Sequence, residues 1–342
     1  MITAASSATQ LLFGSDPQHT SWQDIWRASV RDPHVLLDMV GVSPESIGWS
    51  REAMHQFRMV VTQGFIARMR KGDPNDPLLR QVLPLHAETL AVPGYTYDAV
   101  GDAHALTHAG VLQKYHGRAL LIATGSCAIH CRYCFRRHFP YAEQSALRHN
   151  WKEAIEGIAR DHSIQEVILS GGDPFSLSTE KLVQLTDALG DVAHIRRLRV
   201  HTRLPIVLPE RVDAALCTWL ASLPWPVTCV VHANHANEFD ASVDDALRRL
   251  RQAKVHLFNQ AVLLRGVNDS VGALVALSER AFASGVVPYY LHQLDHVAGA
   301  AHFAVTDAEA RRMHAQLTTL LSGYLVPKLV KEIPGYASKQ PM

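Results

Sequence analysis

Three cysteines stand close together at Cys127, Cys131 and Cys134, with the spacing C-x3-C-x2-C. Three thiolates on one tight loop can hold three irons of a [4Fe–4S] cluster, because soft sulfur ligands suit iron–sulfur chemistry. The other two cysteines, Cys217 and Cys229, lie far along the chain and are expected to be small core residues. The fourth iron would then have no protein ligand and would be open to a small molecule.

A zinc site is the alternative for the same loop. Zinc could take the three cysteines together with His130 or His138. Structural zinc sites usually pair one C-x2-C with a second, distant pair, and this sequence has no second pair. The spacing therefore favours an iron–sulfur cluster over zinc.

Polar residues also gather after five apolar runs further along the chain. Active sites of (β/α) barrels are built from the residues at the C-terminal ends of the strands. The succession of clusters therefore predicts one large polar site at one face of a sheet. The clusters are 170–174, 201–203, 232–235, 259–260 and 292–295.

The elements that would position these residues alternate between strand and helix patterns from about Arg118 onward. This alternation predicts a parallel sheet with right-handed crossovers. Roughly six or seven units in about 210 residues favour a (β/α) barrel over an open sheet. The expected strands are 119–123, 166–169, 198–201, 227–232, 255–264, 287–291 and 325–330. The expected helices are 151–160, 179–189, 211–220, 243–252, 273–283 and 307–321.

The fold class that these patterns predict is α/β, a partial (β/α) barrel with a helical N-terminal region. Residues 1–105 carry apolar side chains at helical spacing and are expected to form that region. Residues 106–342 are expected to form the barrel, which ends in a loop that carries Lys339.

Composition excludes several classes of protein. Formal charges nearly cancel, with 33 Lys and Arg against 32 Asp and Glu, so the net charge of +1 gives no general attraction to nucleic acid or an anionic membrane. With 47% hydrophobic and 19% charged residues, the chain is neither disordered nor fibrous. No apolar run reaches the ~20 residues of a membrane helix, and residues 1–13 lack the pattern of an export signal. We therefore expect a cytoplasmic protein with no nucleic-acid or membrane partner.

The cysteine spacing after the first strand of a barrel resembles the signature of radical S-adenosylmethionine enzymes. The wider segment 127–137 resembles the lysine 2,3-aminomutase family in particular. The matching motifs occur in the family's order over about residues 114–339. They are SGGDP at 170–174, TRLPIVLP at 202–209, NQAVLLRGVND at 259–269, YLHQLD at 290–295 and PGYASK at 334–339.

The resemblance implies an isomerase that moves the amino group of L-lysine from carbon 2 to carbon 3 and so forms β-lysine. It implies three cofactors, a [4Fe–4S] cluster, S-adenosylmethionine and pyridoxal 5′-phosphate. One electron from a donor protein would reach the cluster and cleave S-adenosylmethionine to a 5′-deoxyadenosyl radical. The cofactors would do the difficult chemistry, and the protein would orient and shield it.

Residue by residue, the resemblance assigns Cys127, Cys131 and Cys134 to the cluster. It assigns the glycine-rich turn to the amino group of S-adenosylmethionine, because glycines allow close approach and a carboxylate accepts from an ammonium. For Asp173 the alternative is a plain helix N-cap. The residues implied for S-adenosylmethionine are Gly171, Gly172, Asp173, His232 and Gln260.

Lys339 matches the lysine that holds pyridoxal phosphate as a Schiff base, with Lys328 and Lys331 as nearby competitors. Lys114 and Arg118 match the contacts to the cofactor phosphate. The family often has arginine at the first of these positions, and lysine keeps the charge but loses the bidentate fork.

Three further residues match the substrate contacts of the family. Arg136 is implied for the α-carboxylate of lysine, to which a guanidinium makes a strong and directional contact. Asp295 and Glu332 are implied for the ε-ammonium. The family usually has aspartate at the second of these positions, so Glu332 is a departure that changes reach but keeps the charge.

Within the family, the chain resembles the short branch that supplies β-lysine for modification of translation elongation factor P. This implies a functional link to elongation factor P and its ligase, and a second copy of the chain is a further candidate partner. The chain ends three residues after Lys339, and Ser270 stands where larger relatives have a zinc cysteine, so no zinc is expected. The alternatives are a catabolic lysine aminomutase and, in a different class, a zinc-stabilised binding protein without catalysis.

Overall fold

The computed structural model describes residues 21–108, 110–141 and 151–342. Residues 1–20, on which the export-signal argument rests, lie outside the described residues. The described chain contains one sheet of ten strands, which lie side by side in chain order. The strands are β1 (Leu106–His108), β2 (Val111–Tyr115), β3 (Arg118–Thr124), β4 (Glu166–Gly171), β5 (Arg197–Thr202), β6 (Val227–Val231), β7 (His256–Val262), β8 (Val287–His292), β9 (Lys328–Lys331) and β10 (Gln340–Pro341).

The central strands of the sheet are parallel. Each strand from β3 to β9 pairs in parallel with its neighbour, whereas β1, β2 and β10 add antiparallel pairs at the two ends. The strand order leaves β1 and β10 at opposite edges, so the sheet is open within the described residues. The prediction of a partial (β/α) barrel is therefore confirmed. The three antiparallel strands were not expected, since β1 and β10 have only three and two residues and show no alternation.

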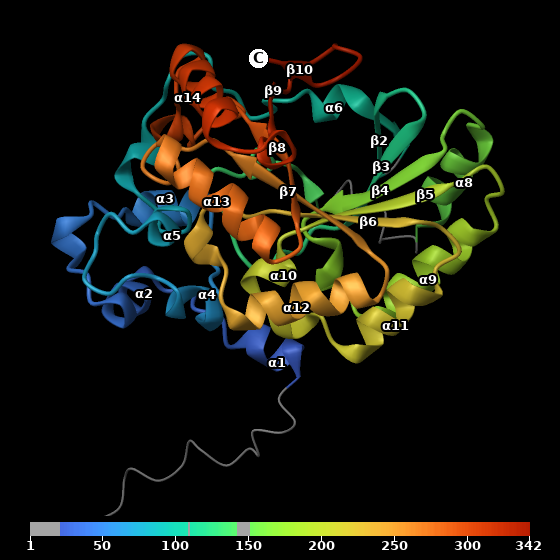
Figure 1. Ribbon diagram of the computed structural model, residues 1–342, viewed down its shortest axis with the longest axis horizontal. Helices are drawn as coiled ribbons and strands as arrows, with labels where there is room; N and C mark the ends of the chain where they lie inside the picture. The colour runs from blue at the N-terminus through green and yellow to red at the C-terminus, as the bar shows by residue number, and fades with distance from the viewer. Residues whose placement is uncertain (1–20, 109, 142–150) are drawn as a thin grey trace, which may run out of the picture.

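The helices alternate with the parallel strands, and several lie along the outside of the sheet (Figure 1). After β3 the chain forms α8 (Lys152–Arg160), α9 (Thr179–Gly190), α10 (Leu204–Val207), α11 (Ala214–Ser222), α12 (Ala241–Gln252), α13 (Val271–Ala283) and α14 (Asp307–Leu320). Short 3₁₀ turns are η4 (Pro174–Ser176), η5 (Pro209–Arg211), η6 (Ala236–Glu238), η7 (Ala301–Phe303) and η8 (Gly323–Leu325). The expected helix at 211–220 begins later because Pro209 starts a 3₁₀ turn and Asp213 caps α11.

Side-chain caps fix where the long helices begin. Asp240 accepts from the amide of Val243 at the start of α12, and Thr306 forms a capping box with Glu309 at the start of α14. Ser270 accepts from the amide of Ala273 and so caps α13. Each cap satisfies an amide that a helix leaves without a partner, and each is worth about 1 kcal/mol.

The chain before the sheet forms short helices. Those within residues 33–80 lie together beside the sheet, whereas the last one, at residues 102–105, lies next to β2 (Figure 1). Leu37 and Phe65 of this segment belong to the same buried cluster as Leu121 of β3 and Val200 of β5. The domain boundary at residue 105 stays a prediction. The elements are α1 (Trp22–Arg27), α2 (Pro33–Val40), η1 (Pro44–Ser46), α3 (Arg51–Gln56), α4 (Gln63–Ala67), α5 (Pro77–Arg80), η2 (His86–Thr89) and α6 (Asp102–Ala105).

A buried ion cluster joins η2 to the segment that carries the three cysteines. The Oε2 atom of Glu88 lies 2.6 Å from Nη2 of Arg132 and 2.9 Å from Nη2 of Arg137. None of the three side chains is exposed to solvent. Arg132 also donates to the carbonyl oxygens of Ala53 and Phe57. The N-terminal helices therefore fix the cysteine segment through a carboxylate shared by two guanidinium groups.

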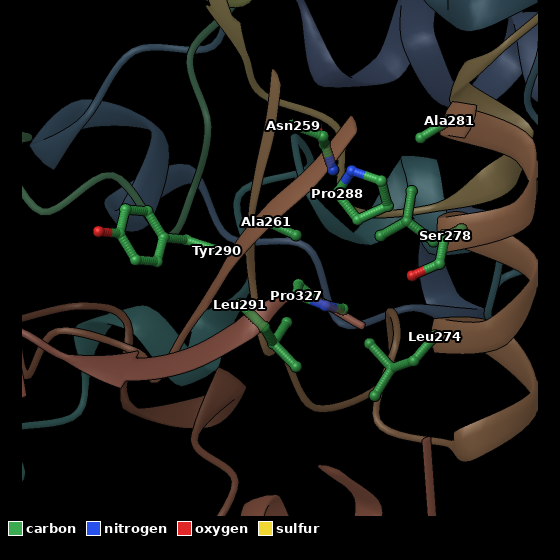
Figure 2. A pocket seen from close by; sticks show the side chains of 10 residues that line it. Asn259, Ala261, Leu274, Ser278, Ala281, Pro288, Tyr290, Leu291 and Pro327 are labelled. Atoms are coloured by element: carbon green, nitrogen blue, oxygen red, sulfur yellow. The ribbon is translucent and has the colours of Figure 1, made fainter. Parts of the chain in front are cut away.

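A small cavity lies between β7, β8 and α13, on the side of the sheet that the helices cover. Figure 2 shows Leu291 of β8 pointing toward α13, while the ring of Tyr290 points away from it. Alternate residues of a strand point to opposite faces, so Tyr290 marks the inner face of the barrel. The cavity is lined by Asn259, Ala261, Leu274, Leu277, Ser278, Ala281, Pro288, Tyr290, Leu291 and Pro327.

In the part of the chain that the structure describes, no helix is long and apolar enough to cross a membrane.

Replacing Glu88 by glutamine should destabilise the protein by about 3–5 kcal/mol, because it leaves two buried guanidinium groups without a counter-charge. Chemical denaturation under anaerobic conditions, followed by circular dichroism, measures the change. The matched control is Glu52→Gln on α3, where the side chain is exposed, and its effect should stay within about 0.5 kcal/mol. Equal effects of the two substitutions would show that the ion cluster does not hold the fold.

Candidate functional site

The three clustered cysteines lie on the loop that follows β3, and all three are free thiols of intermediate burial. Burial, together with the nearby Cys131, raises the pKa of Cys134 to about 11. Burial also raises the pKa of Cys127, with Asp173 and the other two thiols as further causes. The three sulfur atoms therefore lie within electrostatic range of one another, and a positively charged metal group would favour their thiolate forms.

This loop carries the type of ligand that an iron–sulfur cluster takes. Its three free thiols lie on one short segment, and soft sulfur ligands suit iron–sulfur chemistry. Within the described ranges, no three His, Cys, Asp or Glu side chains are grouped so that they could hold one metal ion.

A buried guanidinium lies against one of the three sulfurs. Nη1 of Arg203 is 2.7 Å from Sγ of Cys131 and 2.7 Å from the hydroxyl oxygen of Tyr133. Nη2 of Arg203 donates to Gln81 and, at 2.9 Å, to Glu238. The arginine belongs to the TRLPIVLP segment, yet spacing alone gave it no role. The structure places it as a donor to the cysteine loop.

The glycine-rich turn after β4 packs against the start of the cysteine loop. A Cβ atom on Gly171 would lie 2.5 Å from the carbonyl oxygen of Thr124, and one on Gly172 would lie 2.4 Å from that of Ser126. Gly171 also has a φ of 112°, which side chains rarely adopt. Only glycine allows the turn to approach the loop this closely.

The carboxylate of Asp173 is used inside the fold. It caps η4 by accepting from the amide of Phe175, and it accepts from Thr202 at 2.6 Å. Its other oxygen accepts from the amides of Arg203 and Leu204. This differs from the expected acceptor for an ammonium, because four donors already occupy an acceptor with about four lone pairs. The N-cap alternative describes the side chain as observed, and burial raises its pKa to about 6.

A second group of predicted residues meets at the inner face of the barrel. Nζ of Lys339 lies 2.6 Å from Oε2 of Glu332, and the hydroxyl of Tyr115 donates to Oε1 of Glu332 at 2.5 Å. Nζ of Lys339 also lies 5.9 Å from the ring centre of Tyr290. The structure thus joins β2, β8 and the C-terminal loop. Lys331 pairs with Asp307 instead.

Two acids in this group have opposite pKa shifts. Burial raises the pKa of Asp295 to about 7, with Lys339 lowering it and Glu332 raising it. Burial also raises the pKa of Glu332, but Lys339, Tyr115 and Lys114 outweigh burial and lower it. One carboxylate is therefore charged at neutral pH, while the other is held near the point of protonation.

The predicted phosphate contacts differ in what surrounds them. Nζ of Lys114 lies 2.7 Å from the carbonyl oxygen of Val100, 2.6 Å from Oδ1 of Asp102 and 3.9 Å from Oε1 of Glu332. The distance to Glu332 is too long for a hydrogen bond, but Val100 and Asp102 already hold the ammonium closely. By contrast, Nε of Arg118 is buried and has no hydrogen-bond partner among the described residues. A phosphate therefore fits Arg118 better than Lys114.

Arg136 lies deep in the same region. Its Nε donates to Oδ2 of Asp102 at 2.6 Å, and its Nη1 makes a long contact of 3.4 Å with Ser170. Asp102 connects Arg136 to Lys114, and Lys114 connects to Glu332. The predicted carboxylate and ammonium contacts therefore belong to one network, in which Asp102 was not expected.

Three neutral imidazoles face this network from the strand ends. Burial lowers the pKa of His232 to about 4, and it also lowers the pKa values of His201 and His292. Each has a buried Nε2 atom without a partner in the described part of the chain. Gln260 pairs in register with Tyr290 on the inner face, so it lies in the same region. The roles of His232 and Gln260 in nucleoside binding stay predictions.

The sequence placed His201, Arg203 and His292 in the polar clusters predicted to form one site, but it gave none of the three an individual role. Tyr115 is next to the predicted Lys114, so a wider window around the motif would have included it. Asp102 precedes the motifs altogether, and nothing in the sequence marked it.

Replacing Asp295 by asparagine should stabilise the protein relative to wild type, and this stabilisation should increase as the pH rises. The measurement uses protein prepared without lysine. The native carboxyl, with a pKa of about 7, stays protonated up to about pH 7, whereas the unfolded one ionises near the ordinary aspartate pKa of 3.8. The native state therefore binds the extra proton between these values, and the stability of the wild type falls as pH rises through this window. The advantage of Asp295→Asn should grow by about 2 kcal/mol between about pH 5.5 and about pH 8.

Denaturation curves at several pH values measure this effect. The control is Asp187→Asn on α9, which makes the same substitution at an exposed side chain. A constant difference between Asp295→Asn and wild type would contradict the raised pKa.

Comparison with known proteins agrees with the site. Residues 116–196 match a protein family described as a 4Fe-4S single cluster domain. The chain is 46% identical over 327 residues to L-lysine 2,3-aminomutase of Escherichia coli, covering 95% of each chain. It is 41% identical to L-lysine 2,3-aminomutase of Haemophilus influenzae, covering 94% of this chain and 95% of that protein.

More distant relatives are also named L-lysine 2,3-aminomutase. The chain is 31% identical to L-lysine 2,3-aminomutase of Clostridium subterminale, covering 96% of this chain and 79% of that protein. Among solved structures, a radical SAM methyltransferase from Sphaerobacter thermophilus overlaps with 65% of this chain and 68% of its own, at 15% identity and a TM-score of 0.47.

Proposed function

The chain belongs to the lysine 2,3-aminomutase family, and on this premise we propose that it converts L-lysine to β-lysine by moving the amino group from carbon 2 to carbon 3. The observation that carries the proposal is the 46% identity over 95% of the chain. The site supports it, because one network contains acids suited to an ammonium and a guanidinium suited to a carboxylate.

The family uses a [4Fe–4S] cluster, S-adenosylmethionine and pyridoxal phosphate, which together supply a hydrogen-abstracting radical and an electron-accepting ring. The thiolates of Cys127, Cys131 and Cys134 would hold three irons, and the glycine turn approaches the same loop. Lys339 would hold pyridoxal phosphate. Arg118, whose Nε has no partner among the described residues, would hold the cofactor's phosphate.

The substrate is held at both ends. Arg136 binds the α-carboxylate through its Nη atoms, while Asp295 and Glu332 bind the ε-ammonium. In the chain by itself the ammonium of Lys339 is the counter-ion of Glu332. With Lys339 engaged by the cofactor, Glu332 would lack that counter-charge, and the substrate ammonium would supply it. Alanine or glutamate could not supply a cation here, which explains the preference for a long diamine.

The test is direct. The anaerobically reconstituted, reduced enzyme is incubated with L-lysine and S-adenosylmethionine, and the products are separated by chromatography. We expect β-lysine, and none without S-adenosylmethionine or with the Cys131→Ala variant. Cleavage of S-adenosylmethionine that persists in Cys131→Ala would refute the cluster assignment.

The alternative from a different class is a zinc-stabilised binding protein without catalysis. Anaerobic purification distinguishes the two, since the enzyme should be brown and contain iron, sulfide and a Schiff-base chromophore. A colourless protein that contains zinc would overturn the proposed function.

Replacing Lys339 by alanine should remove the pyridoxal chromophore and all β-lysine formation, while iron content stays at the wild-type level. The reason is that Lys339 is the amine at the inner face, whereas Lys331 pairs with Asp307 and lies outside this network. Absorbance spectra and iron analysis measure both effects. Lys331→Ala is the matched control and should keep the chromophore. A chromophore that survives in Lys339→Ala would move the assignment to Lys328 or Lys331.

We also propose that the β-lysine modifies elongation factor P through its ligase, as in the short branch that the sequence resembles, with catabolism of lysine as the alternative. The enzyme would then work in the cytoplasm with a reducing partner, and the free thiols suit such a compartment. Mass spectrometry of elongation factor P, incubated with its ligase, lysine and this enzyme, tests the link. Ligation that does not depend on the enzyme would favour catabolism.

A further inference from the structure

Asp102 lies between two cations of the proposed site. Its Oδ2 accepts from Nε of Arg136 at 2.6 Å, and its Oδ1 lies 2.6 Å from Nζ of Lys114. The side chain is only 2% exposed, so solvent cannot take over either contact. Burial raises the pKa of Asp102, but the charges of Arg136 and Lys114 outweigh burial and lower it, so the group is ionised.

The backbone holds Asp102 in one place. The carboxylate of Asp98 accepts from the amide of Asp102 at 2.8 Å and from that of Ala103 at 3.0 Å. Gly101 has a φ of 68°, and a Cβ atom added there would lie 3.3 Å from Cβ of Pro334. Asp102 is therefore fixed next to the start of the loop that carries Lys339.

The contact with Asp102 determines which N–H donors of Arg136 remain available to a ligand. Its Nε is used by Asp102, and its guanidinium lies 4.6 Å from the ring centre of Phe135. The Nη1 contact with Ser170 is long at 3.4 Å, and Nη2 has no partner within the described residues. The Nη pair is therefore the part of the fork that can receive a carboxylate.

The second contact connects Asp102 to the other end of the site. Lys114 lies 3.9 Å from Oε1 of Glu332, which carries the ammonium end of the proposed pocket. Arg136, Asp102, Lys114 and Glu332 thus form a row of alternating charges. Each member restricts the position of the next.

We propose that Asp102 is a positioning residue. It sets the orientation of Arg136 and, through Lys114, the distance between Arg136 and Glu332. The proposal rests on the proposed lysine pocket and deepens it, because it names the residue that makes the pocket select a substrate of the right length. Some residues orient a ligand-binding side chain without touching the ligand. Removing such a residue commonly changes ligand affinity about 10- to 100-fold.

The first test is Asp102→Asn. Equilibrium binding is measured on enzyme loaded with all three cofactors but without reductant, so no turnover occurs. The ligands are lysine, lysinamide, which lacks the carboxylate, and ornithine, which is one methylene shorter. The preference for lysine over lysinamide and over ornithine should fall about tenfold or more, while binding of S-adenosylmethionine stays unchanged.

The sharper test is Asp102→Glu, which keeps the charge and adds one methylene. If Asp102 sets position, the longer side chain moves Arg136 and shifts the preference from lysine toward ornithine. Lys114→Met, measured at saturating pyridoxal phosphate, should weaken the preference for lysine over ornithine but keep the preference over lysinamide. Asp161→Asn is the matched control, because this half-buried acid contacts Gln113 beside Lys114 and lies outside the network.

The proposal would be overturned if the Asp102→Glu variant preferred lysine over lysinamide and ornithine to the same degree as wild type. Asp102 would then be only a counter-charge. A stronger preference for lysine over lysinamide in Asp102→Asn would also overturn it. If Asp102→Asn does not fold, the charge-preserving glutamate variant and Lys114→Met decide the question. Wild-type enzyme that does not prefer lysine over lysinamide would count against the proposed function instead.

Discussion

A single buried carboxylate fixes the cysteine loop on which the proposed chemistry depends. The loop has no regular secondary structure of its own, so its position comes from contacts with other parts of the chain. Glu88 supplies the counter-charge for both Arg132 and Arg137, and the three side chains are completely shielded from water. A buried charge that loses its partner costs several kcal/mol, so the N-terminal helices and the loop must fold together. The N-terminal region is thus part of the site's support.

The same rule of paired charges organises the inner face of the barrel. Lys339, Glu332 and Lys114 follow one another, and Asp102 and Arg136 complete the row. A chain with 33 basic and 32 acidic residues can bury this many ions because opposite charges alternate in space. In the proposed function, substrate and cofactor would enter such a row by exchange, because each new ammonium or anion would replace a contact that the protein has already made. Selectivity would then depend on the spacing between neighbouring charges.

Local patterns predicted the parallel strands, the long helices and the cysteine loop, because periodicity and spacing act over a few residues. They did not predict Asp102 or Glu88, whose partners Arg136 and Arg132 lie 34 and 44 residues away. The bond from Tyr115 to Glu332 spans 217 residues and appears only when the sheet brings β2 near the C-terminal loop. Family resemblance supplied site residues that periodicity could not, but it did not show that the carboxylate of Asp173 is already used by four donors of the fold.

The neutral imidazoles at the strand ends add a further constraint. Burial keeps His201, His232 and His292 uncharged, so they add polar atoms to the inner face without adding positive charge next to Lys339. Their buried Nε2 atoms find no partner in the described chain, and each such atom costs about 1–3 kcal/mol. A polar ligand that bonds to them removes this cost, so binding and folding stability are coupled. The barrel therefore gives up stability at these three histidines and recovers it from the helices and ion pairs around them.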